Sequence, residues 1–278
     1  MPRMAPMIDS PANPRVRAAL GLRDRRERDA SGRTLVDGAR ESRRALEAGV
    51  RVVTAFIDRD RLAGEDGLTA IDLARAAGAE VLDVSARAFD RLAYGDRADG
   101  IVLVVETPRA SLETLLPSPA SAPLLVVAEG LEKPGNLGAI LRSADGAGAD
   151  GLVAIGGTDL FNPNVVRASV GTVFSVPVAT ATAAEAREWL RTNAIRAVAA
   201  RVDAKRLHTA ADLTGPLAIV LGSEAEGLSD AWRDGDVEAI RLPMLGIADS
   251  LNVSVAAAVL LYEARRQRDA APPGDTAR

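Results

Sequence analysis

The chain has 278 residues, 47% hydrophobic and 26% charged, which is the composition of an ordinary globular protein of about two domains. The absence of cysteine excludes disulfides, thiolate-ligated zinc and thiol catalysis, and the single histidine, His208, excludes a multi-histidine metal centre. The net charge of −4 argues against indiscriminate nucleic-acid binding.

The charge is unevenly distributed along the chain. Residues 1–50 hold eleven arginines and seven acids, a net of +4, so the remainder carries −8. The densest cluster, Arg23-Asp-Arg-Arg-Glu-Arg28, allows two interpretations. It is either a solvated helix face with paired charges or an RNA-contacting arm in which Arg25 and Arg26 meet phosphates. No apolar segment reaches the ~20 residues of a membrane span, and none resembles a signal peptide, so we expect a cytoplasmic protein.

The N-terminal half alternates between short predicted helices and strands. After a Pro-rich start, the pattern predicts helices at 14–28, 39–48, 68–77 and 85–92, and strands at 34–37, 50–57, 80–84 and 101–105. This order predicts a small, layered α/β domain over residues 1–106. The Pro- and Ser-rich residues 107–122 then predict a linker.

The C-terminal half repeats the alternation with longer apolar strands. Strands are expected at 124–128, 151–155, 176–178, 197–200, 218–221 and 239–242, and helices at 137–148, 163–170, 183–192, 229–233 and 252–268. Continuous apolar strands between helices indicate a parallel sheet that is covered on both faces. We therefore predict a second α/β domain at 123–268 and a flexible tail at 269–278.

Three segments of this second domain carry polar side chains among small residues. They are Asn136-Leu-Gly-Ala-Ile-Leu-Arg142, Leu221-Gly-Ser-Glu224-Ala-Glu-Gly227, and Leu242 to Asn252, which includes Ser250. Each joins a predicted strand to a predicted helix, where small residues let the backbone approach a ligand closely. Asn136 is also a good candidate for the N-cap of its helix.

All three segments, in this order, resemble the SpoU/TrmH branch of the SPOUT methyltransferases. These enzymes move a methyl group from S-adenosylmethionine (SAM) to a ribose 2′-hydroxyl in RNA. The resemblance covers residues 122–268 and, more distantly, 30–106. It implies an α/β fold with a C-terminal trefoil-knotted, parallel-sheet methyltransferase domain and a smaller N-terminal L30e/L7Ae-like domain that binds the RNA substrate. The layout also resembles actinobacterial ribosomal RNA methyltransferases that confer antibiotic resistance.

The resemblance also implies roles for individual residues. Arg142 would contact the ribose and its phosphate. Because a guanidinium group is essentially never deprotonated, it would hold the phosphate and stabilise charge rather than act as a free general base. Glu224 would order the active-site loop. The implied catalytic residues are Asn136, Arg142, Glu224, Ser250 and Asn252, and the implied SAM contacts are Ala200, Leu221, Gly222, Ile240, Leu242 and Leu251.

The sequence allows more than one role for Arg167 and more than one function for the chain. Arg167 either contacts an RNA phosphate or has a structural role. The resemblance implies a homodimer through the knotted domain and no metal ion. The extra N-terminal domain favours ribosomal RNA as the substrate, and a transfer RNA 2′-O-methyltransferase is the alternative. A dinucleotide-binding enzyme would need Gly-x-Gly-x-x-Gly after an early strand, whereas the Gly-Ala-Gly-Ala of 146–149 ends a predicted helix. A non-catalytic RNA-binding protein is a further alternative, disfavoured by the intact set of polar motif residues.

Overall fold

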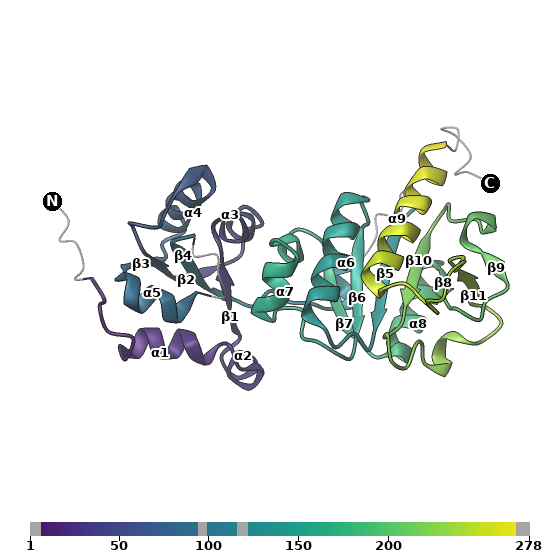
Figure 1. Cartoon of the computed structure of the whole chain (residues 1–278), viewed down its shortest axis with the longest axis horizontal. Coiled ribbons are helices and arrows are strands. Elements are labelled where there is room, and N and C mark those ends of the chain that lie inside the picture. The colour runs from purple at the N-terminus through teal and green to yellow at the C-terminus, as the bar shows by residue number, and fades with distance from the viewer. Residues whose placement is uncertain (1–6, 94–98, 116–121, 271–278) are drawn as a thin grey trace. The chain divides into compact units, whose positions relative to one another are not determined.

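The computed structural model describes residues 7–93, 99–115 and 122–270 (Figure 1). They form two compact units. The first runs up to Pro108 and also takes in Asp159–Ser175, and the second comprises Arg109–Thr158 and the residues from Val176 onward. Residues 116–121 of the predicted linker, and all but two residues of the predicted tail at 269–278, fall outside the described residues.

A mixed four-stranded sheet forms the centre of the first unit. Its strand order is β1 (Arg33–Asp37), β4 (Ile101–Glu106), β2 (Val52–Ile57), β3 (Glu80–Asp83), and only β2 and β3 pair in parallel. One face packs on α1 (Pro14–Gly21) and α5 (Ala86–Leu92), and α3 (Ala39–Glu47) and α4 (Gly64–Ala76) cover the other. The predicted layered α/β arrangement is therefore present (Figure 1).

Two helices of the first unit differ from the sequence prediction. The single helix expected at 14–28 is split into α1 and α2 (Arg25–Ser31), because Asp24 starts a new helix by accepting a hydrogen bond from the Arg26 N–H. Helix α4 begins at Gly64, four residues before the predicted start. Its first turn contains two glycines, which have low helix propensity and obscure the start in the sequence.

The segment Asp159–Ser175, which contains α7 (Pro163–Ala168) and the 3₁₀ turn η2 (Thr172–Phe174), belongs to the first unit. Helix α7 packs on β1, an edge strand of the four-stranded sheet. The segment is held by the Arg28–Asp159 ion pair at 2.7 Å, by the Thr34 hydroxyl, which donates to the Phe161 carbonyl, and by Arg44, which donates to the Val170 carbonyl. The predicted division at 107–122 does not anticipate this, because these contacts join residues more than 120 positions apart.

A seven-stranded parallel sheet forms the second unit, as the sequence predicts. Its order is β7, β6, β5, β10, β8, β11, β9, and every pair of neighbours is parallel. The bounds are β5 (Leu124–Glu129), β6 (Gly151–Ile155), β7 (Val178–Ala181), β8 (Arg196–Ala200), β9 (Arg206–Leu207), β10 (Leu217–Leu221) and β11 (Glu238–Arg241). The two-residue edge strand β9 was not predicted, and β7 begins two residues later than expected.

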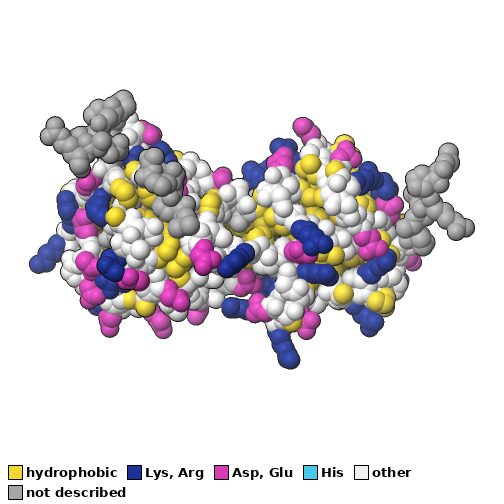
Figure 2. Space-filling model, turned by 180° about the vertical axis from the view of Figure 1, so that it is seen from behind, with side chains coloured by type: hydrophobic (Ala, Val, Ile, Leu, Met, Phe, Trp, Pro, Cys, Tyr) yellow, Lys and Arg dark blue, Asp and Glu magenta, His cyan; other side chains and the backbone are white. Residues whose placement is uncertain are grey.

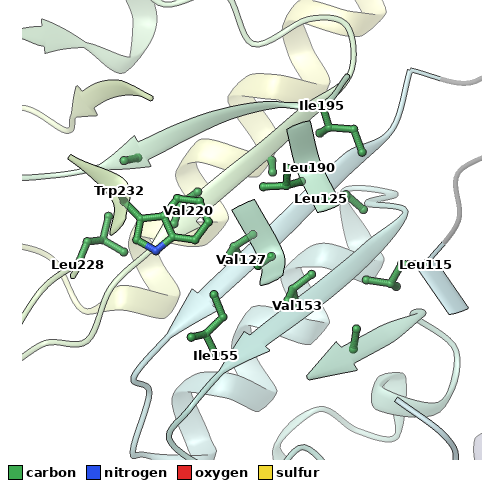
Figure 3. Close-up of a cluster of buried hydrophobic side chains, with 14 residues drawn as sticks. Leu115, Leu125, Val127, Val153, Ile155, Leu190, Ile195, Val220, Leu228 and Trp232 are labelled. Atoms are coloured by element: carbon green, nitrogen blue, oxygen red, sulfur yellow. The ribbon is translucent and has the colours of Figure 1, made fainter. Parts of the chain in front are cut away.

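Helices cover both faces of this sheet. On one face α6 (Pro134–Gly146) and α9 (Val253–Ala270) pack side by side (Figure 1). On the other face, α8 (Ala183–Thr192) and the 3₁₀ turns η1 (Leu112–Leu115) and η4 (Asp230–Trp232) enclose an apolar cluster that includes Trp232 and Val220 (Figure 3). The helix predicted at 229–233 is thus a single 3₁₀ turn. With both faces buried, the loops at the carboxyl ends of the strands are the natural place for a ligand.

Candidate active site

Three loops of the second unit meet where parallel strands end. Strands β5 and β10 are neighbours in register, with Ala128 opposite Leu221, so the loops that follow them start side by side. The third loop leads from β11 into α9. These are the three segments that the sequence singled out.

A carboxylate joins the three loops. Glu224 Oε1, in the loop after β10, accepts from Asn136 Nδ2 at 3.1 Å and from Asn252 Nδ2 at 2.9 Å. Asn252 Nδ2 also donates to Asn136 Oδ1 at 3.1 Å. Three of the five predicted catalytic residues therefore form one hydrogen-bonded network, with one residue from each loop.

The two asparagines reach this network in different ways. Asn136 is not the N-cap of its helix, contrary to the sequence expectation, because α6 already begins at Pro134 with Lys133 in the cap position. Its amide is therefore free to bind Glu224. Asn252 both holds the start of its helix and binds Glu224. Its Oδ1 accepts from the N–H and the hydroxyl of Ser254 at the start of α9, while its Nδ2 donates to Glu224.

Lys133 is a member of the site that the sequence analysis missed. Its Nζ lies 2.7 Å from Glu224 Oε2. The hydrogen bond from Lys133, followed by the one from Asn136, lowers the pKa of the Glu224 carboxyl, and Glu224 in turn raises the pKa of Lys133. Glu224 is thus held as an ionised acceptor. A signal was available, since the chain has only two lysines among its 34 basic residues and one of them lies three positions before Asn136, the first residue of the first motif.

A cavity of about 720 Å³ lies beside the network, a size typical of small-molecule sites. Its lining includes all six residues predicted to contact the cofactor, together with Glu224 and Ser250; the six are Ala200, Leu221, Gly222, Ile240, Leu242 and Leu251. Gly222 is required for this shape, because a Cβ at this position would lie 2.3 Å from the carbonyl carbon of Gly227. The side chains of Arg201 and Asp203, paired at 2.6 Å, add a charged part to the wall.

The structure does not bring Arg142 into this group. The residue is exposed on α6, six positions and therefore about 120° around the helix axis from Asn136. It does not line the cavity and forms no ion pair among the described residues.

The predicted RNA-contacting arginines all lie in the first unit. Arg25 is exposed with Nε 3.7 Å from Asp29, and Arg26 is exposed without an ion-pair partner in the described ranges. Arg28, by contrast, is buried against Asp159, which gives it a structural role. Arg167 lies 3.7 Å from the buried Asp37, so its observed contact is also structural.

Two classes of site have no support in the described part of the chain. No cluster of three histidine, aspartate or glutamate side chains there could hold a metal ion. None of the helices described is both long and apolar enough to cross a membrane.

Comparison with known proteins agrees with this geometry. Residues 123–262 match the SpoU rRNA Methylase family, and residues 13–103 match the MRM3-like substrate binding domain. The chain is 34% identical over 260 residues to a 23S rRNA (uridine(2479)-2′-O)-methyltransferase of Streptomyces viridochromogenes, covering 90% of this chain and 88% of that protein.

Two solved structures are similar over nearly the whole chain. One is the SpoU methyltransferase AviRb from Streptomyces viridochromogenes in complex with the cofactor AdoMet, at 32% identity and a TM-score of 0.83, covering 94% of this chain and all of that one. The other is an RNA 2′-O ribose methyltransferase at 42% identity and a TM-score of 0.82, covering 94% of this chain and 99% of that one. The resemblance read from the three motifs is confirmed, and the chain belongs to the SpoU rRNA methylase family.

Proposed function

We propose that the chain transfers a methyl group from SAM to a ribose 2′-hydroxyl of large-subunit ribosomal RNA. The observation that carries the proposal is the Glu224 network, which unites the three motif loops beside a cavity lined by every predicted cofactor residue. The names of the relatives, which act on 23S rRNA, favour ribosomal over transfer RNA. The intact network argues against a binding protein without activity.

The cavity has the character that SAM requires. Apolar side chains such as Leu221, Ile240 and Leu242 suit the adenine ring, and Gly222 leaves the backbone open to it. Carboxylates at the rim, including Glu224 and Asp249, suit the positive sulfonium. When bound, SAM supplies an electrophilic methyl group.

The residues of the chain contribute mainly by positioning. The ionised Glu224 fixes the amides of Asn136 and Asn252, so both side chains are oriented before the RNA arrives. Ser250 lines the cavity and offers a hydroxyl to the reacting ribose. Arg142 would hold the phosphate next to the target ribose through its planar fork and stabilise negative charge on the 2′-oxygen.

A homodimer would bring Arg142 to a cavity. Helix α9 exposes an apolar stripe of Val255, Val259 and Tyr262, spaced to lie on one helix face. A Cβ at Gly146 would lie 2.8 Å from the Tyr262 hydroxyl, and Arg142 is one turn before Gly146 on α6. Arg142 therefore emerges beside the exposed stripe. We propose that the stripe packs against the same stripe of a second copy. Arg142 would then bind the RNA phosphate beside the cavity of that second copy.

Three further features follow from this proposal. The trefoil knot would thread α9 through the loops that line the cavity. A ribosomal RNA substrate would place the protein with ribosomes in the cytoplasm. Resistance to an antibiotic would follow if the methylated nucleotide lies in a drug-binding site of the ribosome.

Gly222→Ala tests the cofactor cavity. The new methyl group collides with backbone at Gly227, so the loop has to move. We expect the Kd for SAM, measured by calorimetry with chelator present, to rise at least about tenfold, which corresponds to about 1.4 kcal/mol. The matched control is Gly235→Ala, where a Cβ meets nothing within 4 Å. Equal affinities in the two variants would refute the placement of the cofactor.

Arg142→Ala tests the role of the exposed arginine. Turnover is expected to fall at least about a hundredfold, as for removal of a charge-stabilising group, while the Kd for SAM stays within about twofold. Arg142→Lys is expected to be nearly as poor, because lysine lacks the planar fork. Arg191→Ala removes a comparably exposed helical arginine as a control. Wild-type turnover in Arg142→Ala contradicts the assignment.

The arginine cluster separates into RNA-binding and structural positions. Basic and acidic side chains are interspersed on the face seen in Figure 2, so single arginines rather than a broad patch have to be tested. Arg25→Glu with Arg26→Glu should weaken binding to rRNA fragments and flatten the salt dependence of the affinity, because fewer counterions are released.

Arg28→Met is the matched structural variant. Because it leaves Asp159 without its partner, we expect a lower Tm. The salt dependence of the affinity of the remaining folded protein for rRNA fragments should not change. If the double Arg25/Arg26 variant keeps the salt dependence of the wild-type affinity, these arginines do not contact RNA, and the cluster is a solvated helix face.

Substitution of the α9 stripe tests the dimer. Val255→Glu with Val259→Glu places two carboxylates in the proposed interface, so light scattering should change from twice 29.0 kDa to 29.0 kDa. Methylation should be lost together with the dimer. Leu68→Glu, at an exposed apolar residue of α4, is the control. A wild-type protein that is monomeric at tens of micromolar excludes this interface.

A further inference from the structure

The loops after β5 and β10 exchange carboxylate contacts in both directions. Glu224 of the second loop accepts from Lys133 and Asn136 of the first. In the opposite direction, Glu129 at the end of β5 accepts from Ser229, beyond the second loop. Its Oε2 lies 2.9 Å from the Ser229 N–H donor and its Oε1 lies 2.8 Å from the Ser229 hydroxyl.

The contact between Glu129 and Ser229 holds the base of a small hairpin. Ser223 and Gly227 pair through two backbone hydrogen bonds of 3.1 and 3.0 Å, and the Ser223 hydroxyl accepts from the Glu226 N–H. Leu228, next to the hairpin, is buried in the apolar cluster that contains Trp232. Residues 222–228 therefore form a stiff unit that lines the cavity and carries Glu224 at its exposed tip.

A stiff hairpin needs support at its base if the carboxylate at its tip is to be placed accurately. On one side Gly222 packs directly on Gly227 with no room for a side chain. On the other side, Ser229 is held by both oxygens of Glu129, which is fixed at the end of a central strand. Glu129 and Ser229 are absent from the cavity lining, so they affect the site through the segments that they hold in place and not by contact with a ligand.

We infer that Glu129 and Ser229 are positioning residues for the methyl-transfer site. Together they fix the base of hairpin 222–228, so that Glu224 meets the amides of Asn136 and Asn252 in the orientation needed for turnover. The inference rests on the proposed function, because it assigns the pair to that reaction. Since Ser229 is exposed and Glu129 half-buried, loss of the contact should affect geometry more than overall stability.

The chain offers a matched control for this contact. Glu185 accepts from the N–H and the hydroxyl of Thr182, both at 2.8 Å, in the capping box of α8. Each carboxylate thus accepts from the N–H and the hydroxyl of one residue, Glu129 with a different oxygen for each donor and Glu185 with Oε2 for both. Glu129 lies beside the motif loops and Glu185 in a helix cap. Glu129→Ala and Glu185→Ala should lower the Tm by similar amounts.

The kinetic effects should separate the two variants. We expect Glu129→Ala to lower kcat at least about tenfold with a smaller change in KM for SAM, whereas Glu185→Ala keeps wild-type kcat. Glu129→Gln should recover part of the loss, since its carbonyl oxygen still accepts one hydrogen bond. Ser229→Ala should add nothing in the Glu129→Ala background, because the two residues share one contact.

A second readout does not require methylation. Hydrogen exchange of the amides at 223–229 should accelerate in Glu129→Ala and stay unchanged in Glu185→Ala. If the wild-type protein fails to methylate RNA, the proposed function fails while this measurement still reports on the contact. The inference is overturned by unchanged exchange in Glu129→Ala, by kcat within twofold of wild type, by an equal loss of kcat in Glu185→Ala, or by additive effects of Glu129→Ala and Ser229→Ala.

Discussion

The geometry of the site depends on one shared acceptor, the carboxylate of Glu224. A carboxylate without a proton can accept from several donors at once, and here it takes an ammonium and an amide from the segment after β5 and a second amide from the segment before α9. Because the hydrogen bond from Lys133 lowers the pKa of Glu224, the group stays ionised to a lower pH than an unpaired glutamate. Protonation would turn one of its oxygens into a donor and remove the charge that pairs with Lys133.

The sheet explains why these segments meet. Strands β5, β10, β8 and β11 are parallel neighbours, so their carboxyl ends open at the same edge. Helices bury both faces, which leaves that edge as the accessible part of the sheet. The cavity lies there, and apolar strand ends together with Gly222 form its wall. Fold and site are thus linked by strand direction. Each motif follows a strand, and the parallel order of the strands brings these distant segments together at one end of the sheet.

The sequence predicts most of this arrangement, and the parts that it misses share a cause. Apolar strand runs and the three motifs correctly indicate the parallel sheet, the family and the residues around the cavity. The pattern cannot show that Asp24 divides one predicted helix in two, or that the Lys133 position caps α6 and frees Asn136. Nor can it show that Asp159–Ser175 joins the first unit through Arg28 and Thr34. Each of these depends on which partner a polar side chain finds in three dimensions, and local periodicity contains no such information.

The most direct test of the account is the identity of the methylated atom. The purified protein is incubated with SAM carrying a tritiated methyl group and with 23S rRNA, and nuclease digests are analysed by mass spectrometry. The account predicts one ribose 2′-O-methylated nucleotide, formed by the wild-type protein and not by a Glu224→Ala variant that still folds. Methyl groups on a base, on transfer RNA alone, or at equal levels with Glu224→Ala would contradict it.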